Sequence, residues 1–175
     1  MDQDSANAST PPELNNPLWQ YALALWSQPA IEELCLALQG QGWSVTRVLC
    51  ACWLASRGQA YGPEPEPVTQ WREQLTKPLR ALRQRLPRED ATVTALRSRV
   101  ACAELEAERV ELALAYRELQ SADQATTAAP DTLIWSNLLA AAPTHPIDAD
   151  TRQLMTALIQ QLPPQSAGGT TPCAG

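Results

Sequence analysis

Hydrophobic residues recur at helical spacing from residue 16 onward. Asn16-Pro17 supplies a capping side chain followed by a first-turn proline, which predicts the start of a helix. One face of this helix consists of Leu18, Tyr21, Ala22 and Leu25. A second helix is predicted from about residue 30 to Gly40, with the apolar stripe Ile31, Leu34, Cys35 and Leu38.

The next segment is apolar on every side. Ser44 is a capping residue, and residues 45–54 are apolar or cysteine apart from Thr46-Arg47. A helix that is apolar all round must be covered all round. Its longest run without a polar residue spans only residues 48–55, whereas a membrane span needs about 20. This segment is therefore predicted to form the centre of a helical bundle.

Two longer amphipathic helices follow the Pro/Gly/Glu loop GQAYGPEPEP. The first carries the stripe Val68, Trp71, Leu75, Leu79, Leu82 and Leu86. Pro78 lies inside it and is expected to kink or split it. The second, over about 91–122, repeats apolar residues at heptad spacing over 93–114. Its far half has a second stripe, Leu105, Leu112 and Leu119, and is expected to be contacted on two sides.

These patterns predict an all-α fold, a compact helical bundle with a long antiparallel helical hairpin. The composition agrees, because Leu and Ala dominate and Phe is absent. The heptads fit pairing within the hairpin or between two chains, so a homodimer stays open. The expected domains are a disordered leader (1–14), a helical domain (15–122), a linker with two short amphipathic helices (123–162) and a disordered tail (163–175).

Charge is distributed unevenly along the chain. Lys and Arg number 13 and Asp and Glu 19, a net charge of −6, yet residues 72–99 hold eight basic and three acidic residues. An antiparallel hairpin gathers six arginines at its tip: Arg80, Arg83, Arg85, Arg88, Arg97 and Arg99. This basic tip predicts binding of an anion or an acidic protein surface. The net acidity and the lack of interleaved aromatic residues argue against nucleic acid as the partner.

Tryptophan is the second candidate feature. The chain has six Trp, and Trp19, Trp26, Trp53 and Trp71 lie in the predicted helices. Trp supplies a large buried area and an N–H group that needs a partner. These residues are expected to form either ordinary core or an apolar pocket between helices.

Motifs for catalysis and metal binding are not recognised. Cys50 and Cys52, two positions apart on a helix, point about 200° from each other, which favours core packing over a metal site. His145 is the single histidine and lies in the loop PTHP. The acids Glu104, Glu106, Glu108 and Glu111 are interpreted as a solvated helix face rather than a metal cluster. In the antiparallel hairpin Arg72 lies opposite three of them, Glu104, Glu108 and Glu111, and is expected to pair there. No cofactor and no metal is therefore expected.

The compartment is predicted from the cysteines and the amino terminus. Five Cys is an odd number, and the acidic, polar residues at the start of the chain lack a positively charged segment before a hydrophobic run. Reduced thiols in the cytoplasm, with no membrane span, are the expected state.

Four blocks of sequence occur in a fixed order: LWQYALALWSQPAIEELCLALQGQGWSV, VLCACWLASRG, WREQLTKPLRALRQRL and AELEAERVELAL. In these blocks, over about 17–119, the chain resembles an uncharacterised family of small proteobacterial proteins, a domain of unknown function. The family often has Asn where this chain has Thr46, so no role is assigned to that position. The resemblance implies a compact, helical, cytoplasmic protein of a bacterium, and it implies no activity.

Three function classes follow in order of support. The first is a non-catalytic interaction or regulatory module that binds a protein partner through the hairpin and its basic tip. The second is a carrier of a small apolar ligand in the Trp-rich bundle. The third is an enzyme of unrecognised type.

Overall fold

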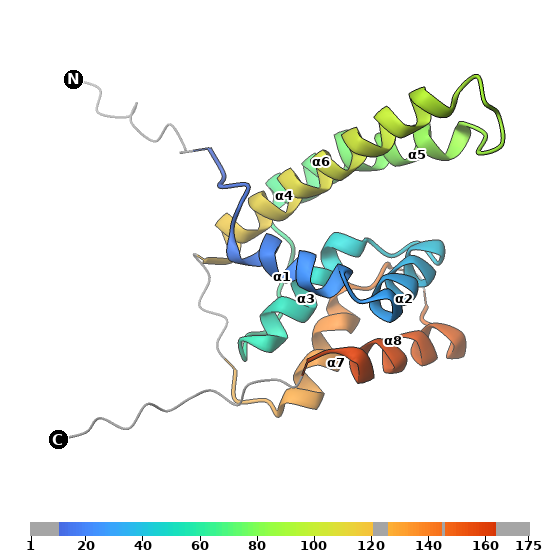
Figure 1. Ribbon diagram of the computed structural model, residues 1–175. Helices are drawn as coiled ribbons and strands as arrows, with labels where there is room; N and C mark the ends of the chain where they lie inside the picture. The colour runs from blue at the N-terminus through green and yellow to red at the C-terminus, as the bar shows by residue number, and fades with distance from the viewer. Residues whose placement is uncertain (1–10, 121–125, 145, 164–175) are drawn as a thin grey trace, which may run out of the picture.

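The computed structural model describes residues 11–120, 126–144 and 146–163, and within these ranges it contains helices and loops but no β-strand. The prediction of an all-α, compact helical bundle is confirmed. Figure 1 shows the bundle on one side and a long hairpin lying along it. Most of the expected leader and tail, together with His145, falls outside the described residues.

The helices follow one another in the order α1 (Pro17–Trp26), α2 (Pro29–Gly40), α3 (Val45–Ser56), α4 (Glu66–Trp71), the π-helical turn η1 (Arg72–Thr76), α5 (Lys77–Arg85), α6 (Thr94–Gln120), α7 (Pro130–Ala141) and α8 (Ala149–Gln161). None of these helices is long and apolar enough to cross a membrane.

Two of the first three helices begin at capping residues that the sequence indicated. The Asn16 side chain accepts a hydrogen bond from the Trp19 backbone N–H at 2.9 Å. Ser44 accepts one from the Arg47 N–H at 3.4 Å. Between α2 and α3, Gly42 adopts a φ of 87°, a left-handed conformation that glycine reaches without steric cost. Local chemistry thus sets the ends of these helices.

Helix α3 is the centre of the bundle, as its all-round apolar pattern predicted. Helices α1, α2, α6 and α7 all pack against it. Its residues from Val45 to Ala55 are buried, apart from Arg47. Cys50 and Cys52 point to different sides of the helix and both fill core positions.

The helices after residue 130 are part of the same core. Helix α7 packs along α3, and α8 packs against α2. Their buried residues include Leu133, Ile134, Leu138, Met155 and Leu158. The Asn137 side chain adds hydrogen bonds, because it donates to the Ala51 and Gln59 carbonyls at 3.1 and 2.9 Å and accepts from the Tyr61 N–H at 2.9 Å.

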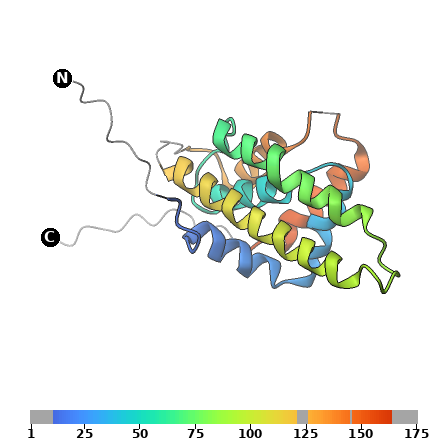
Figure 2. The same ribbon diagram turned by 90° about the horizontal axis from the view of Figure 1, so that it is seen from above.

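The hairpin consists of residues 66–85 paired with α6 (Figure 1; Figure 2). Pro78 does not end its helix, because residues 66–85 stay helical throughout. Instead the wider turn η1 lies directly before this proline, which has no N–H group to donate. The expected disturbance therefore takes the form of a π-helical turn.

The second apolar stripe of α6 divides between core and surface. Leu112 and Leu119 are buried in the core cluster, whereas Leu105 is 53% exposed. Helix α6 packs against α1 and α3 as well as against its hairpin partner, so the expected contact on two sides is present. Because the bundle covers Leu112 and Leu119, these two residues are not available as an interface with a second chain.

Two leucines of α6 provide a test of this packing. Leu112→Ala is expected to lower the free energy of unfolding by about 2–5 kcal/mol, because it opens a cavity in a closed core. Leu96→Ala, on the same helix at a side chain 52% exposed, is expected to change it by no more than about 0.5 kcal/mol. Urea denaturation followed by circular dichroism measures both. Similar losses for the two variants would contradict the assigned positions.

Candidate partner-binding site

A buried ion triad lies where the hairpin meets the bundle. The Arg72 guanidinium donates two hydrogen bonds to Glu64, both at 2.5 Å, and its Nε donates to Glu111 Oε1 at 2.7 Å. Glu111 also accepts from the Thr76 hydroxyl at 2.8 Å and from the Thr46 hydroxyl. Arg72 is 5% exposed and Glu111 0%. Residues from the loop before α4, from η1, from α6 and from α3 therefore meet at one point.

Each charge of this triad stabilises the ionised form of its partner. Burial by itself raises the pKa of Glu64, but the hydrogen bonds and the positive charge of Arg72 outweigh it and leave that pKa below its ordinary value. Burial also works against the charged form of Arg72, yet its bonds to Glu64 and the charges of Glu111 and Glu64 raise the pKa of the guanidinium. Glu64 and Arg72 are consequently ionised at neutral pH.

A second set of ion pairs closes the middle of the hairpin. Arg80 donates to Glu104 at 2.9 Å and also to Glu108, and Arg83 donates to both oxygens of Glu104, one of them at 3.1 Å. Burial raises the pKa of Glu104, but the bonds from Arg83 and Arg80 overcome this and lower it. For Glu108 burial prevails, and its pKa is raised. The charges of Arg80 and Arg83 are therefore paired with acids inside the hairpin.

Of the remaining four arginines of the basic tip, one binds backbone carbonyls and three are exposed. Arg97 donates to the Leu86 carbonyl at 2.8 Å and to the Arg83 carbonyl, so it holds the end of α5. Arg85, Arg88 and Arg99 are exposed, and no ion pair or hydrogen bond joins their side chains to the described residues. The structure thus leaves three of the six predicted residues free to bind a partner.

Apolar side chains accompany these free arginines. Leu82 on α5 is 45% exposed and Leu96 on α6 is 52% exposed. Both lie in the tip half of the hairpin, which reaches past the helices of the bundle (Figure 1; Figure 2). The free surface of the tip therefore combines guanidinium groups with aliphatic carbon.

The four tryptophans singled out by the sequence do not form one pocket. Trp53 is in the core, where its ring lies 5.7 Å from that of Tyr116 and beneath the Arg57 guanidinium. Trp71 is half-buried in the hairpin and donates to the Ala107 carbonyl at 2.9 Å. Only Trp19 and Trp26, both on α1, line a common cavity.

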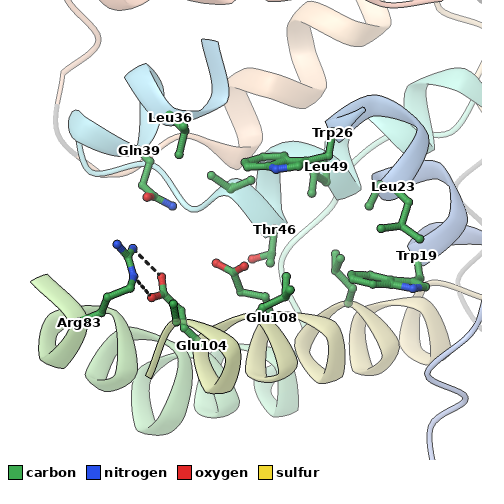
Figure 3. Close-up of a pocket in the computed structure, with 15 residues that line it drawn as sticks. Trp19, Leu23, Trp26, Leu36, Gln39, Thr46, Leu49, Arg83, Glu104 and Glu108 are labelled. Atoms are coloured by element: carbon green, nitrogen blue, oxygen red, sulfur yellow. Dashed lines mark hydrogen bonds and ion pairs between the residues drawn. The ribbon is translucent and has the colours of Figure 1, made fainter. Parts of the chain in front are cut away.

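This cavity is an apolar groove of about 250 Å³ between the bundle and the hairpin. One side is formed by α1, α2 and α3 and the other by α6, with Arg83 of α5 at one end (Figure 3). Leu23, Leu36 and Leu105 line it and are 45%, 46% and 53% exposed. The groove therefore presents apolar area that the fold leaves uncovered.

A basic cleft of about 440 Å³ continues from the groove toward the hairpin tip. Leu36, Gln39 and Arg83 line both cavities, and Gln84, Arg88 and Arg97 are among the residues that line only the cleft. An apolar cavity and a basic cavity thus share one boundary.

The interpretation of the α6 acids as a solvated face is wrong for most of them. Glu104 and Glu111 are buried and Glu108 is half-buried in its ion pair, whereas Glu106 is exposed. Glu64, in the loop before α4, completes the buried ion triad. The expected pairing of Arg72 is present with Glu111, whereas Glu104 pairs with Arg80 and Arg83 and Glu108 with Arg80. The helical periodicity of the arginines at 80 and 83 was a signal for these further pairs.

Three of the described cysteines occupy core positions. Cys35, Cys50 and Cys52 are buried and free, and burial raises the pKa of Cys35 to about 12. Over the ranges that the structure describes, no three His, Cys, Asp or Glu side chains are grouped to hold a metal ion.

Comparison with known proteins identifies the family. The family model described as "Protein of unknown function (DUF2390)" matches residues 17–114, more than half of the chain. The chain belongs to this family. The match includes α1 to α5 and most of α6, so the buried ion triad, the apolar groove and the basic tip all lie within the family region. Neither the curated proteins nor the solved structures give a match.

The buried ion triad is expected to stabilise the fold of this family member strongly. Arg72→Ala leaves the buried Glu111 and the half-buried Glu64 without their cation and is expected to lower the free energy of unfolding by about 3–5 kcal/mol. Lys77→Ala removes an exposed pair with Glu73, one turn further along, and is expected to cost about 0.5 kcal/mol or less. Chemical denaturation compares the two. An Arg72→Ala protein as stable as Lys77→Ala would contradict the assigned role.

Acid is expected to weaken the ion pairs that hold the hairpin together. The pKa values of Glu64 and Glu104 are lowered by folding, so their stabilisation is complete above the unfolded value of about 4.3 and is lost as the pH falls through their folded values. Glu108, whose pKa is raised, acts in the opposite direction and offsets part of this loss. Denaturation midpoints measured from pH 7 to pH 3 give the slope of stability against pH. Glu64→Gln should make it shallower, and an unchanged slope would exclude Glu64 as a cause.

Proposed function

We propose that the protein is a non-catalytic interaction or regulatory module that binds a protein partner through the tip of its hairpin. The observation that carries the proposal is the division of the six arginines. Arg85, Arg88 and Arg99 remain exposed and unpaired within the described part of the chain, beside exposed Leu82 and Leu96. Unpaired guanidinium groups next to aliphatic side chains are a binding surface for carboxylates with apolar neighbours.

Charge complementarity defines the partner's surface. The free residues of the tip are cationic although the whole chain has a net charge of −6. An acidic partner is attracted to the tip, while the rest of the chain repels it, so encounter is directed to one end of the hairpin. The expected partner is therefore an acidic protein surface with apolar residues in it, sought in the cytoplasm that the sequence predicts.

A small-ligand carrier is the second candidate. The observation in its favour is the apolar groove beside Trp19 and Trp26. The groove is smaller than the roughly 300–1,000 Å³ of ordinary small-molecule pockets, and three leucines on its lining stay about half exposed. These properties favour contact with a partner over enclosure of a ligand.

A charge-reversed tip tests the proposal. The variant Arg85→Glu/Arg88→Glu/Arg99→Glu changes only exposed residues without an internal partner and spares Arg83 and Arg97, which hold the hairpin together. Its binding to an acidic partner is expected to fall at least tenfold. A tagged pull-down from the native bacterium at low salt, read by mass spectrometry, identifies candidates, and the Kd of the purified pair measures the loss.

The control variant has the same net charge as the charge-reversed tip. It is Arg57→Glu/Arg117→Glu/Arg152→Glu, which alters three arginines outside the hairpin tip, and it is expected to bind like the wild type. Equal binding by the tip variant and the wild type would exclude the tip. A pull-down in which the tip variant and the control lose the same proteins would show a response to net charge alone. A second copy of this chain as the captured protein would replace the proposed partner by a homodimer.

A further inference from the structure

The apolar groove and the basic cleft form one continuous surface. Their shared lining residues are Leu36, Gln39 and Arg83, with Trp19 in the groove on one side of this boundary and Arg88 in the cleft on the other. Figure 3 shows Trp19 and Arg83 at opposite ends of the groove. Among the lining residues, the apolar side chains lie toward Trp19 and the guanidinium groups toward Arg88. Arg109, whose guanidinium lies over the Trp19 ring, is not part of either lining.

We propose that this surface is the docking site for a single amphipathic segment of the protein partner, with bulky apolar side chains in the groove and carboxylates at the cleft. The inference rests on the proposed function, because it names the part of the partner that is bound. Recognition of this kind, in which an amphipathic segment places its apolar side chains in a groove between helices, is a recurrent mode of peptide binding.

The groove is suited to side chains from such a segment. Helix α1 presents Trp19, Leu23 and Trp26 on one side and α6 presents Leu105 on the other. Trp19 and Trp26 are half-buried and Leu23 and Leu105 about half exposed, so their apolar area stays partly in contact with water. Covering it gains roughly 25 cal/mol for each Å² removed from water. Because these leucines are exposed, a segment of a partner protein can bind across the groove and cover them.

The cleft is suited to carboxylates. Arg88 is exposed and unpaired within the described residues. Arg97 bonds the two carbonyls through Nη1 only, so its Nε and Nη2 donors take no part in those bonds. Arg83 uses Nε and Nη2 for Glu104, which leaves Nη1. Since a guanidinium has five N–H donors, these three residues can still bind anionic oxygen.

The acids of the groove fix the direction of the bound segment. Figure 3 shows the Glu108 carboxylate facing the groove opposite Thr46, with Glu104 next to it. Glu104 is neutralised by Arg80 and Arg83, and Glu108 by Arg80. A further carboxylate placed here would meet two acids whose cations are already engaged. The acidic end of the segment therefore lies at the cleft and its apolar end toward Trp19.

Site-specific photo-cross-linking of the full chain in its native bacterium tests this arrangement. A benzophenone amino acid replaces Leu36 or Leu105 in the groove, Gln84 in the cleft, or Leu139 on α7 as the control, all of them exposed. Mass spectrometry identifies the cross-linked peptide. The groove and cleft positions are expected to mark one partner segment, with its acidic residues next to position 84 and its bulky apolar residues next to position 105. Position 139 is expected not to mark it.

Binding of the identified segment, made as a synthetic peptide, supplies the energetic test. Leu105→Asn is expected to weaken the peptide's Kd at least tenfold, whereas Leu139→Asn, which changes an exposed leucine elsewhere, is expected to leave it unchanged. Arg88→Glu is expected to weaken it similarly. A peptide with its facing acid changed to Arg should recover binding to Arg88→Glu while losing it to the wild type.

Each alternative gives a different result. Cross-links from the cleft but not the groove, with full binding by Leu105→Asn, would overturn the inference and leave the proposed function standing. A segment without acidic residues, a second copy of this chain, or a small molecule retained by the wild type and lost from Leu105→Asn would also overturn it. No cross-link at any position, together with no partner lost from the charge-reversed tip, would refute both.

Discussion

A buried arginine held between two carboxylates is the interaction on which the rest of the structure depends. Ions this far from water cost several kcal/mol each unless they are paired and fully hydrogen-bonded. Arg72, Glu64 and Glu111 satisfy that condition only when η1, the loop before α4 and α6 meet, and Thr46 of α3 completes the bonding. The triad therefore fixes how the two arms of the hairpin meet, and the hydrogen bond from Thr46 to Glu111 ties them to α3.

The position of the hairpin determines which of its other charged residues are paired. Toward the tip from the triad, Arg80 and Arg83 meet acids of α6, and Arg97 meets the last carbonyls of α5. In the same part of the hairpin, Arg85, Arg88 and Arg99 are exposed and have no partner among the described residues. The same position leaves α1 and α6 apart at the apolar groove. The internal ion pairs and the exposed basic and apolar surface are thus two results of one helix arrangement.

The proposed interaction follows from this division of roles. The inner part of the hairpin is stabilised by buried pairs, so it can hold an outer part that carries charge and apolar area together without collapsing onto the bundle. A surface built in this way combines long-range attraction by the tip with short-range burial in the groove. Both features lie within residues 17–114, which the DUF2390 family model matches.

The sequence by itself determined where the first helices begin and which helix lies at the centre of the bundle. Asn16, Ser44 and Pro17 mark helix starts, and an all-round apolar segment can only be central. It also placed six arginines near one end of a hairpin. Only the tertiary structure decided which of them are free, that Trp19 and Trp26 but not Trp53 and Trp71 share a groove, and that α7 and α8 join the core. Periodicity assigns a residue to a face of its own helix, whereas pairing depends on the rotation and offset between helices, which distant contacts set.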